Sequence, residues 1–377
     1  MTIGYDAKRL FTNYTGLGNY SRTLLRNLAH HYPEHSYTLY TPRINQSAET
    51  LPFLNNSTYR VVQPSGGVKS LWRSYGVADR FASDELDLYH GLSHEIPFKV
   101  HRAGIKTVVT IHDLIFKAYP ETYPFFDRQI YDFKFRYACE EADRVIAISE
   151  HTKRDIIKYY GISAEKIDVV YQSIAPLFFE PKDPGHDQET IQRLNLPQEF
   201  LLYVGSIQER KCVDLIIQAY EILQPSERIP LIIVGSGSAY EQRMMEHVAA
   251  AGLNDLVIRL SGLSDNRDLK SLYGQASALV YPSKYEGFGL PVTEALLCQT
   301  PAITTTASSL PEAGGPDSLY ITPDDAEGLA EAIRQVLQDT DLRQRMVEKG
   351  EAYALQHFGA QETSQRMLEV YQQVIAQ

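Results

Sequence analysis

The sequence predicts an α/β protein made of two doubly wound domains. Its 377 residues exceed what a single hydrophobic core usually accommodates, so we expect two domains. Within each half, short apolar segments alternate with segments of helical periodicity. This alternation is typical of parallel sheets that are covered by helices on both faces. Two such domains in series would face each other across a cleft at the carboxyl ends of their strands, where α/β proteins bind ligands.

The first half, residues 1–180, carries the elements of the first predicted domain. A loop through Gly16 and Gly18 is expected between the first strand and a helix. The helix at 149–161 begins with Ser149, a favourable N-cap, and ends at Gly161. In chain order, we expect strands at 2–6, 37–41, 105–114, 144–149 and 166–171, and helices at 19–31, 125–142 and 149–161.

The second half, residues 181–360, repeats the pattern after a segment at 178–190 that is rich in Pro, Asp and Gly. We interpret that segment as the linker between the domains. We expect strands at 200–206, 230–237, 256–262 and 277–283, helices at 212–223, 266–276 and 292–299, and a last amphipathic helix at 361–377.

Composition and charge exclude several classes of protein. The chain is 44% hydrophobic and 22% charged, as in ordinary globular proteins. It has no run of about 18 apolar residues and no signal-peptide pattern at its start, so we expect a cytoplasmic protein, either free or on a membrane surface. The net charge of -11 argues against general nucleic-acid binding. The three cysteines, Cys139, Cys212 and Cys298, are expected to be buried and reduced.

The stretch PSKYEGFGLPVTEAL, residues 282–296, concentrates the features of a ligand site. Gly287 and Gly289 give the backbone freedom and let a ligand approach it closely. Pro291 suits the first turn of a helix. The amides of residues 288–292 would then lie at a helix start, where the macrodipole favours an anion such as phosphate.

Glu286 and Glu294 flank this turn. A carboxylate only accepts hydrogen bonds, so both side chains suit the hydroxyls of a ribose or a sugar rather than the phosphate itself. The alternative is structural, with a solvated glutamate on a loop and a first-turn glutamate that complements the helix dipole. Spacing alone leaves both interpretations open.

Two cations and a histidine also lie at the predicted carboxyl ends of strands. Ser206, Arg210 and Lys211 come between a strand and a helix. An arginine binds two phosphate oxygens in a fork and a lysine supplies a point charge, so the pair suits a diphosphate, although this stretch alone is more simply explained by surface cations. His112 follows an apolar strand, where it can hydrogen-bond a sugar hydroxyl or fill a structural role.

Dinucleotide and metal sites have little support in the sequence. Neither the glycine cluster at 16–18 nor that at 235–237 has the third glycine, or the acidic residue downstream, of a dinucleotide-binding loop. We interpret the first cluster as a loop that allows close backbone approach and the second as a plain turn. No spacing of histidines indicates a metal, and the only D-x-D, Asp339 to Asp341, indicates a helix cap.

Together these segments resemble the large family of retaining, nucleotide-sugar-dependent glycosyltransferases called family 4 or group 1, which have the GT-B fold of two Rossmann-like domains. The most specific part is the E-x7-E element from Glu286 to Glu294. Other matching segments include LLYVGSIQERK, LIIVGSGS, LSGLSDNRDLKSLYGQA, DDAEGLAEAI, TGLGNYSRTLLRNL, IHDLIFKAYPETY and VIAISEHTKRDIIKYYG. The resemblance covers nearly the whole chain, and it implies that the last helix, 361–377, crosses back onto the first domain.

The resemblance implies a role for each candidate residue. Glu294 would bind the nucleotide ribose, and Glu286 would face the transferred sugar. Arg210 and Lys211 would hold the diphosphate and stabilise it as it leaves, while His112 would contact the sugar near the reacting centre. The other implied donor contacts, in part from main-chain atoms, are Gly16, Gly18, Ser206, Leu263 with Ser264, Gly287, Phe288, Gly289 and Leu290.

The resemblance further implies front-face attack with retained anomeric configuration, helped by proton transfer to the leaving phosphate. Neither a metal nor a cofactor is implied, because the cations and the helix start supply positive charge. Two departures matter. Many members have Arg where Ser206 stands, which leaves open which cation contributes most to binding the diphosphate. Many have Asn where Cys212 stands, a difference that concerns packing more than chemistry.

The stretch IHDL…YPE is most similar to bacterial mannosyltransferases of polysaccharide and lipopolysaccharide assembly. This similarity implies GDP-mannose as the donor and a glycan, free or lipid-linked, as the acceptor that the first domain binds. A UDP-sugar donor, a nicotinamide-dependent oxidoreductase and a non-catalytic sugar-nucleotide binder are the alternatives. Residues 69–81, KSLWRSYGVADRF, are compatible with a peripheral membrane contact or with an ordinary amphipathic helix that places Trp72 in the core.

Overall fold

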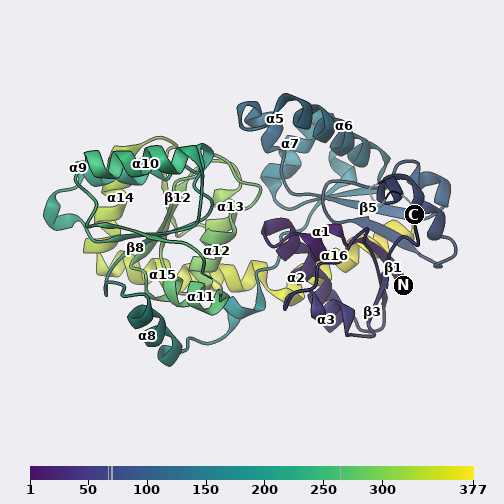
Figure 1. Ribbon diagram of the computed structural model, residues 1–377, viewed down its shortest axis with the longest axis horizontal. Coiled ribbons are helices and arrows are strands. Elements are labelled where there is room, and N and C mark those ends of the chain that lie inside the picture. Colours follow the sequence, from purple (N-terminus) through teal and green to yellow (C-terminus); the bar gives the residue numbers. More distant parts are fainter. Residues whose placement is uncertain (67, 69–70, 264) are drawn as a thin grey trace. The chain divides into compact units, whose positions relative to one another are not determined.

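Two parallel β-sheets organise the chain, one in each of two units (Figure 1). The computed structural model describes residues 1–66, 68, 71–263 and 265–377. The first unit comprises Met1–Ser173 and Phe358–Gln377, and the second comprises Ile174–His357. The predicted α/β fold with two doubly wound sheets is confirmed.

The sheet of the first unit has seven parallel strands in the order β3-β2-β1-β4-β5-β6-β7. The strand order therefore reverses between β1 and β4, as in doubly wound folds. The strands are β1 (Thr2–Asp6), β2 (Ser36–Tyr40), β3 (Tyr59–Val62), β4 (Leu88–Gly91), β5 (Lys106–Ile111), β6 (Arg144–Ala147) and β7 (Ile167–Val169). The patterning above did not predict β3 or β4.

The helices of the first unit come from both ends of the chain. They are α1 (Lys8–Thr12), α2 (Gly16–His31), α3 (Leu51–Leu54), the π-helical turn η1 (Trp72–Gly76), α5 (Ile115–Ala118), α6 (Phe125–Glu141), α7 (Glu150–Tyr160) and α16 (Ala360–Ile375). Ser149 caps α7 as predicted, since its Oγ accepts the amide of Thr152 at 3.0 Å. Helix α16 packs against α2 and β5, and its Tyr371 hydroxyl lies 2.7 Å from Nδ1 of His90 on β4.

The sheet of the second unit has six parallel strands in the order β10-β9-β8-β11-β12-β13. The order reverses between β8 and β11, and open α/β sheets bind their ligands at the carboxyl ends of the strands beside such a reversal. The strands are β8 (Leu201–Val204), β9 (Leu231–Val234), β10 (Val257–Leu260), β11 (Ala278–Tyr281), β12 (Ala302–Thr305) and β13 (Leu319–Ile321). The helices are α8 (Pro184–Arg193), α9 (Asp214–Ile222), α10 (Ala239–Ala250), α11 (Asn266–Gln275), α12 (Leu290–Leu297), α13 (Leu310–Gly314), α14 (Ala326–Gln338) and α15 (Thr340–Phe358).

The structure corrects the interpretation of residues 178–190 as a linker. Helix α8 begins at Pro184, and Asp183 caps it by accepting the amide of His186 at 3.1 Å. The Thr190 hydroxyl donates to Asp268 on α11 at 3.1 Å. Proline at a helix start and aspartate at an N-cap are common helix signals, so a loop-like composition here conceals a packed helix.

Gly16 and Gly18 were expected in a loop, and this expectation is wrong, because both lie in the first turn of α2. The side-chain oxygen of Asn13 accepts the amides of Thr15 and Gly18 at 3.1 and 2.9 Å and so satisfies helix-start donors. A Cβ on Gly18 would lie 1.8 Å from the Asn13 carbonyl oxygen, whereas a Cβ on Gly16 would meet nothing. Gly18 therefore allows a close approach by the main chain of Asn13.

Two further expectations concern the cysteines and membrane spans. Cys139, Cys212 and Cys298 are free and buried, as predicted. Within the described ranges, no helix is long and apolar enough to cross a bilayer.

Candidate active site

The loops that follow β8 and β11 are joined by hydrogen bonds. The amide of Lys284 donates to the carbonyl of Arg210 at 2.9 Å, and the Ser283 hydroxyl lies 3.3 Å from the same oxygen. The first loop carries a single 3-10 turn, Glu209–Lys211, before α9 begins. Because β8 and β11 are neighbours in the sheet, the two loops present their side chains to one place.

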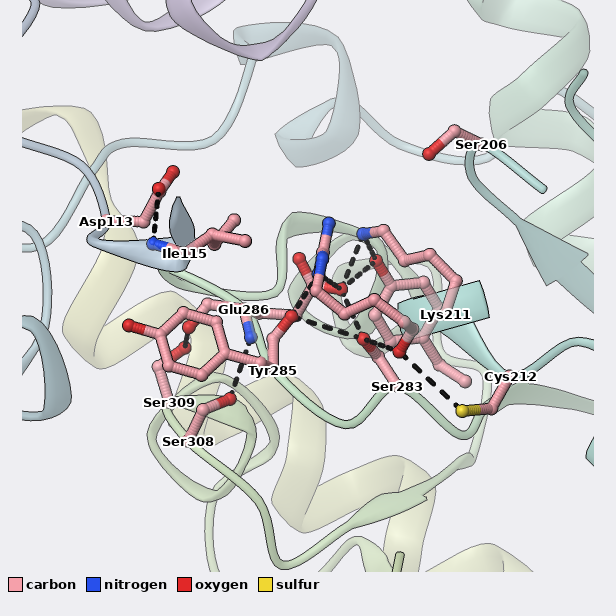
Figure 2. Close-up of polar contacts among 12 residues, drawn as sticks. Asp113, Ile115, Ser206, Lys211, Cys212, Ser283, Tyr285, Glu286, Ser308 and Ser309 are labelled. Carbon is pink, nitrogen blue, oxygen red and sulfur yellow. Dashed lines mark hydrogen bonds and ion pairs between the residues drawn. The ribbon is translucent and has the colours of Figure 1, made fainter. Parts of the chain in front are cut away.

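Four donors converge on one oxygen of Glu286, in the loop after β11 (Figure 2). Oε1 lies 2.5 Å from Lys211 Nζ and 3.1 Å from an Arg210 guanidinium nitrogen. The hydroxyls of Ser283 and Tyr281 donate to it at 2.6 and 3.1 Å. No described residue makes a hydrogen bond to Oε2, so that oxygen keeps its capacity to accept.

Electrostatics keep Glu286 ionised although only 8% of the residue is exposed. Burial by itself would raise the pKa of its carboxyl, but the charges of Lys211 and Arg210 outweigh burial and lower the pKa to about 2. Two cations beside one carboxylate leave a formal excess of one positive charge. That excess suits an anionic ligand such as a diphosphate.

Glu294, on the first half of α12, has the opposite environment. It is partly buried, and its Oε2 accepts a 2.8 Å hydrogen bond from the Tyr273 hydroxyl. Burial raises the pKa of its carboxyl from 4.5 to about 7, and the bond from Tyr273 offsets only part of that effect. The two glutamates of the E-x7-E element thus differ strongly in the pH range in which each carries its charge.

The turn between the glutamates is fixed by packing. Gly289 has φ +120°, and a Cβ there would lie 3.0 Å from Leu310 and 3.1 Å from Ala313 on α13. The Ser309 hydroxyl donates to the carbonyls of Glu286 and Phe288, at 2.9 and 2.7 Å. Glycine is therefore favoured at this position by its conformation, and any larger residue would press against the side chains of α13.

Helix α12 begins at Leu290, with Pro291 in its first turn as predicted. The amide of Glu286 donates to the Ser308 hydroxyl at 2.8 Å, so this amide already has a hydrogen-bond partner within the chain (Figure 2). Gly287 and Leu290 are half-buried at the helix start, and their contacts with a donor stay a prediction.

The remaining predicted donor contacts of the second unit lie at loops after other strands or away from the cluster. Ser206 is exposed and stands apart from Glu286 in Figure 2. Leu263 follows β10 in a half-buried loop, and Ser264 lies outside the described residues. The cluster at 235–237 is more than a plain turn, since a Cβ on Gly235 would lie 1.9 Å from the Gly205 carbonyl oxygen.

His112 directly follows β5 in the first unit and is buried. Its Nε2–H donates to the carbonyl of Leu92 at 2.9 Å, and its ring meets the Tyr20 ring edge-on at 4.5 Å. Burial lowers the pKa of the imidazole to about 4. The ring is therefore neutral near pH 7, with Nδ1 as an acceptor that no described residue of the chain engages.

Sequence patterning missed the hydroxyls that organise the site. Ser283 lies within the stretch 282–296 and Tyr281 lies directly before it, but the patterning predicts both only as part of a strand, and Tyr273 only as part of a helix. A tyrosine inside an apolar run is the available signal, because a buried phenol needs a polar partner. Among the described residues, no group of three or more His, Cys, Asp and Glu side chains is arranged to hold a metal ion.

Comparisons with known proteins match both units. The family described as Glycosyltransferase Family 4 matches residues 14–176, and the family described as Glycosyl transferases group 1 matches residues 186–353. The chain is 30% identical over 272 residues to O-antigen chain mannosyltransferase B of Escherichia coli, covering 71% of this chain and 70% of that protein. It is 29% identical to the O-antigen chain mannosyltransferase RfbU of Salmonella typhimurium, covering 73% and 71%.

Solved structures match over nearly the full length. The crystal structure of Anabaena HepE in complex with UDP superposes with a TM-score of 0.76 at 18% identity, covering 99% of each chain. At this level of identity the likeness concerns the fold.

Proposed function

The chain belongs to the group 1, family 4 glycosyltransferases with the GT-B fold, and on that premise we propose that it transfers mannose from GDP-mannose to a glycan acceptor with retention of configuration. We further propose that the acceptor is a growing surface polysaccharide, free or lipid-linked, and that the protein works on the cytoplasmic side of the membrane. Two O-antigen mannosyltransferases among the relatives support the choice of sugar.

The convergence of Lys211 and Arg210 on Glu286 is the observation that carries the proposal. The diphosphate of the donor would engage the two cations, while Oε2 of Glu286 would accept a hydroxyl of the mannose. The bond between the sugar C1 and the phosphate oxygen breaks, and a bond from C1 to the acceptor oxygen forms on the same face. The acceptor proton passes to the leaving phosphate, whose negative charge the cations stabilise.

The other candidate residues have supporting parts in this proposal. Glu294 would accept the ribose hydroxyls, and main-chain donors from 287–290 would face the sugar and phosphate. In the first unit, the free Nδ1 of neutral His112 would accept a sugar hydroxyl, and the start of α2 at Gly16 and Gly18 would border the phosphates. The reaction would need no metal, so activity should survive EDTA.

Thermal stabilisation by GDP, UDP, ADP, CMP and NAD tests the donor class first. A ligand at 100 times its dissociation constant adds about 2.7 kcal/mol, which shifts the melting temperature by several degrees. We expect a shift with GDP. A shift with UDP alone would replace the donor by a UDP-sugar, and a response to NAD alone would indicate an oxidoreductase.

Turnover then separates an enzyme from a binder. Slow hydrolysis of GDP-mannose, followed by proton NMR, should release the α-anomer first, because retention preserves the configuration of the donor. Glu286→Gln should abolish release and keep GDP binding. First release of the β-anomer would exclude retention, and binding without turnover in the wild type would indicate a non-catalytic protein.

A further inference from the structure

We propose that the first unit carries a docking surface for an anionic lipid bilayer, formed by aromatic and aliphatic side chains of α6 and of the segment around η1. The proposal concerns residues of the first unit alone and does not depend on the identity of the donor. It also extends the sequence prediction, in which segments such as residues 69–81 were considered for membrane contact.

Exposed large apolar side chains are concentrated in two short segments. Within the described part of the chain, twelve such side chains are exposed, and seven of them lie between residues 68 and 75 or between 125 and 133. Phe126 and Phe133 are 78% and 63% exposed. The seven are Val68, Leu71, Tyr75, Phe125, Phe126, Ile130 and Phe133. Scattered exposed apolar residues are ordinary, but such a concentration marks an interaction site.

The two segments form one surface. Phe126, Ile130 and Phe133 are spaced four and three residues apart and so share one face of α6, while the opposite face is buried. The ring of Phe98 stacks on Tyr75 with centroids 5.0 Å apart and lies 5.8 Å from Phe133. We call the seven exposed residues together with Phe98 the aromatic surface.

Trp72 itself is not part of this surface. It is partly buried and packs against the core, with its ring 6.5 Å from that of Tyr40. The sequence interpretation that placed Trp72 in the core is therefore supported, whereas Leu71 and Tyr75 of the same segment face outward. Residues 69 and 70 lie outside the described part of the chain.

Cations without ion-pair partners border the aromatic surface. Lys99 and Arg102 are exposed, and the amide of Lys99 donates to the Tyr137 hydroxyl of α6 at 2.6 Å, which places this segment beside the helix. The guanidinium of Arg128 lies over the Phe125 ring at 5.5 Å. None of these three cations is in an ion pair with a described residue.

The nearby acids are mostly neutralised within the chain. The ion pairs with lysine or arginine are Asp132 with Lys117, Glu95 with Arg73 and Lys134, and Glu140 with Arg136. Among the described residues, Asp127 and Glu141 are the acids of α6 without a lysine or arginine partner, against the three cations Lys99, Arg102 and Arg128. The surface therefore combines exposed aromatic rings with a local excess of positive charge.

That combination fits an anionic bilayer better than a second copy of the chain. Aromatic residues sit well at the level of lipid headgroups, and apolar burial and attraction to anionic lipids add to each other. In a two-fold dimer the same patch would face itself and bring like cations together. We therefore assign the surface to peripheral membrane docking.

Co-sedimentation of the full chain with vesicles tests the assignment. We expect the protein to sediment with phosphatidylglycerol–phosphatidylethanolamine vesicles, less with phosphatidylcholine vesicles, and less at 0.5 M NaCl. The double variant Phe126→Ser/Phe133→Ser should lower the partition coefficient at least tenfold. The matched control Leu51→Ser/Ile157→Ser removes two exposed aliphatic side chains of the same unit and should bind as the wild type does.

A second variant separates charge from apolar contact. Lys99→Gln/Arg102→Gln should reduce binding to anionic vesicles while leaving the weak binding to neutral ones unchanged. Circular dichroism and melting curves of all variants should match the wild type, since the altered side chains are exposed. Failure of the wild type to bind anionic vesicles, or equal binding by the Phe126/Phe133 variant, would overturn the proposal. So would a concentration-dependent dimer in sedimentation velocity that this variant abolishes while vesicle binding is absent.

Discussion

Replacing Glu294 by glutamine should stabilise the ligand-free protein at alkaline pH and leave it unchanged at acid pH. Burial raises the pKa of this carboxyl from 4.5 to about 7. The folded state thus holds the proton more tightly than the unfolded state does. Stability from this group is fully present below pH 4.5 and is lost as the pH rises through 7. Glutamine is neutral throughout and still offers an oxygen to the Tyr273 hydroxyl.

The magnitude follows from the difference between the two pKa values. At about 1.4 kcal/mol per unit, a pKa raised from 4.5 to about 7 corresponds to a loss of about 3 kcal/mol across this range. For a unit of this size, each kcal/mol moves the melting temperature by about 2–4 °C. Glu294→Gln should therefore melt about 6–12 °C higher than the wild type at pH 8, and within about 1 °C of it at pH 4.5.

Differential scanning calorimetry between pH 4.5 and 8.5, without nucleotide, makes the measurement. Calorimetry can resolve separate transitions of the two units, and only one transition should respond to the substitution. Glu199→Gln, an exposed glutamate of the same unit, serves as the matched control. If the difference between Glu294→Gln and the wild type does not change with pH, the raised pKa of Glu294 is refuted.

Three further predictions follow from single contacts. Gly18→Ala should lower the free energy of unfolding by about 2 kcal/mol or more, because its Cβ would lie 1.8 Å from a backbone oxygen. Gly16→Ala, with open space around the new Cβ, should be neutral or slightly stabilising. Urea titrations of both variants make the comparison. Tyr281→Phe leaves a buried lysine and carboxylate without their shared hydroxyl, so it should cost about 1–3 kcal/mol and lower kcat more than it raises KM for the donor. Tyr371→Phe removes the partner of His90 Nδ1 and should lower the free energy of unfolding of the first unit by about 1–3 kcal/mol, while the calorimetric transition of the second unit stays unchanged.

The sequence predicted those parts of the fold whose signal is local. Strand β5 and strand β11 are apolar runs, and both were found where expected. Strand β4 was missed because it contains His90, which is buried through hydrogen bonds to Thr110 and to Tyr371, 281 residues away in the chain. The hydrophobic periodicity of a short segment cannot reveal a hydrogen bond to a residue so distant in the sequence.

The same limit applies to the candidate site. The motif predicted that Glu286 and Glu294 both matter, because the two flank a turn with a recognisable composition. It did not predict that one carboxyl would have a pKa of about 2 and the other about 7. That difference depends on which buried groups surround each side chain, and Tyr281 and Tyr273 reach them only after the strands and helices have packed.

The order in which the two units can be completed follows from where α16 packs. The ribosome delivers all of the second unit, a continuous segment, before it delivers the helix that covers α2 and β5. The first unit is started first and finished last, so the part of its sheet and of α2 that α16 covers stays uncovered while about half of the chain is synthesised. Until α16 is made, the apolar side chains that it covers are exposed to aggregation unless a chaperone binds them. A chain truncated before Ala360 would expose these side chains permanently.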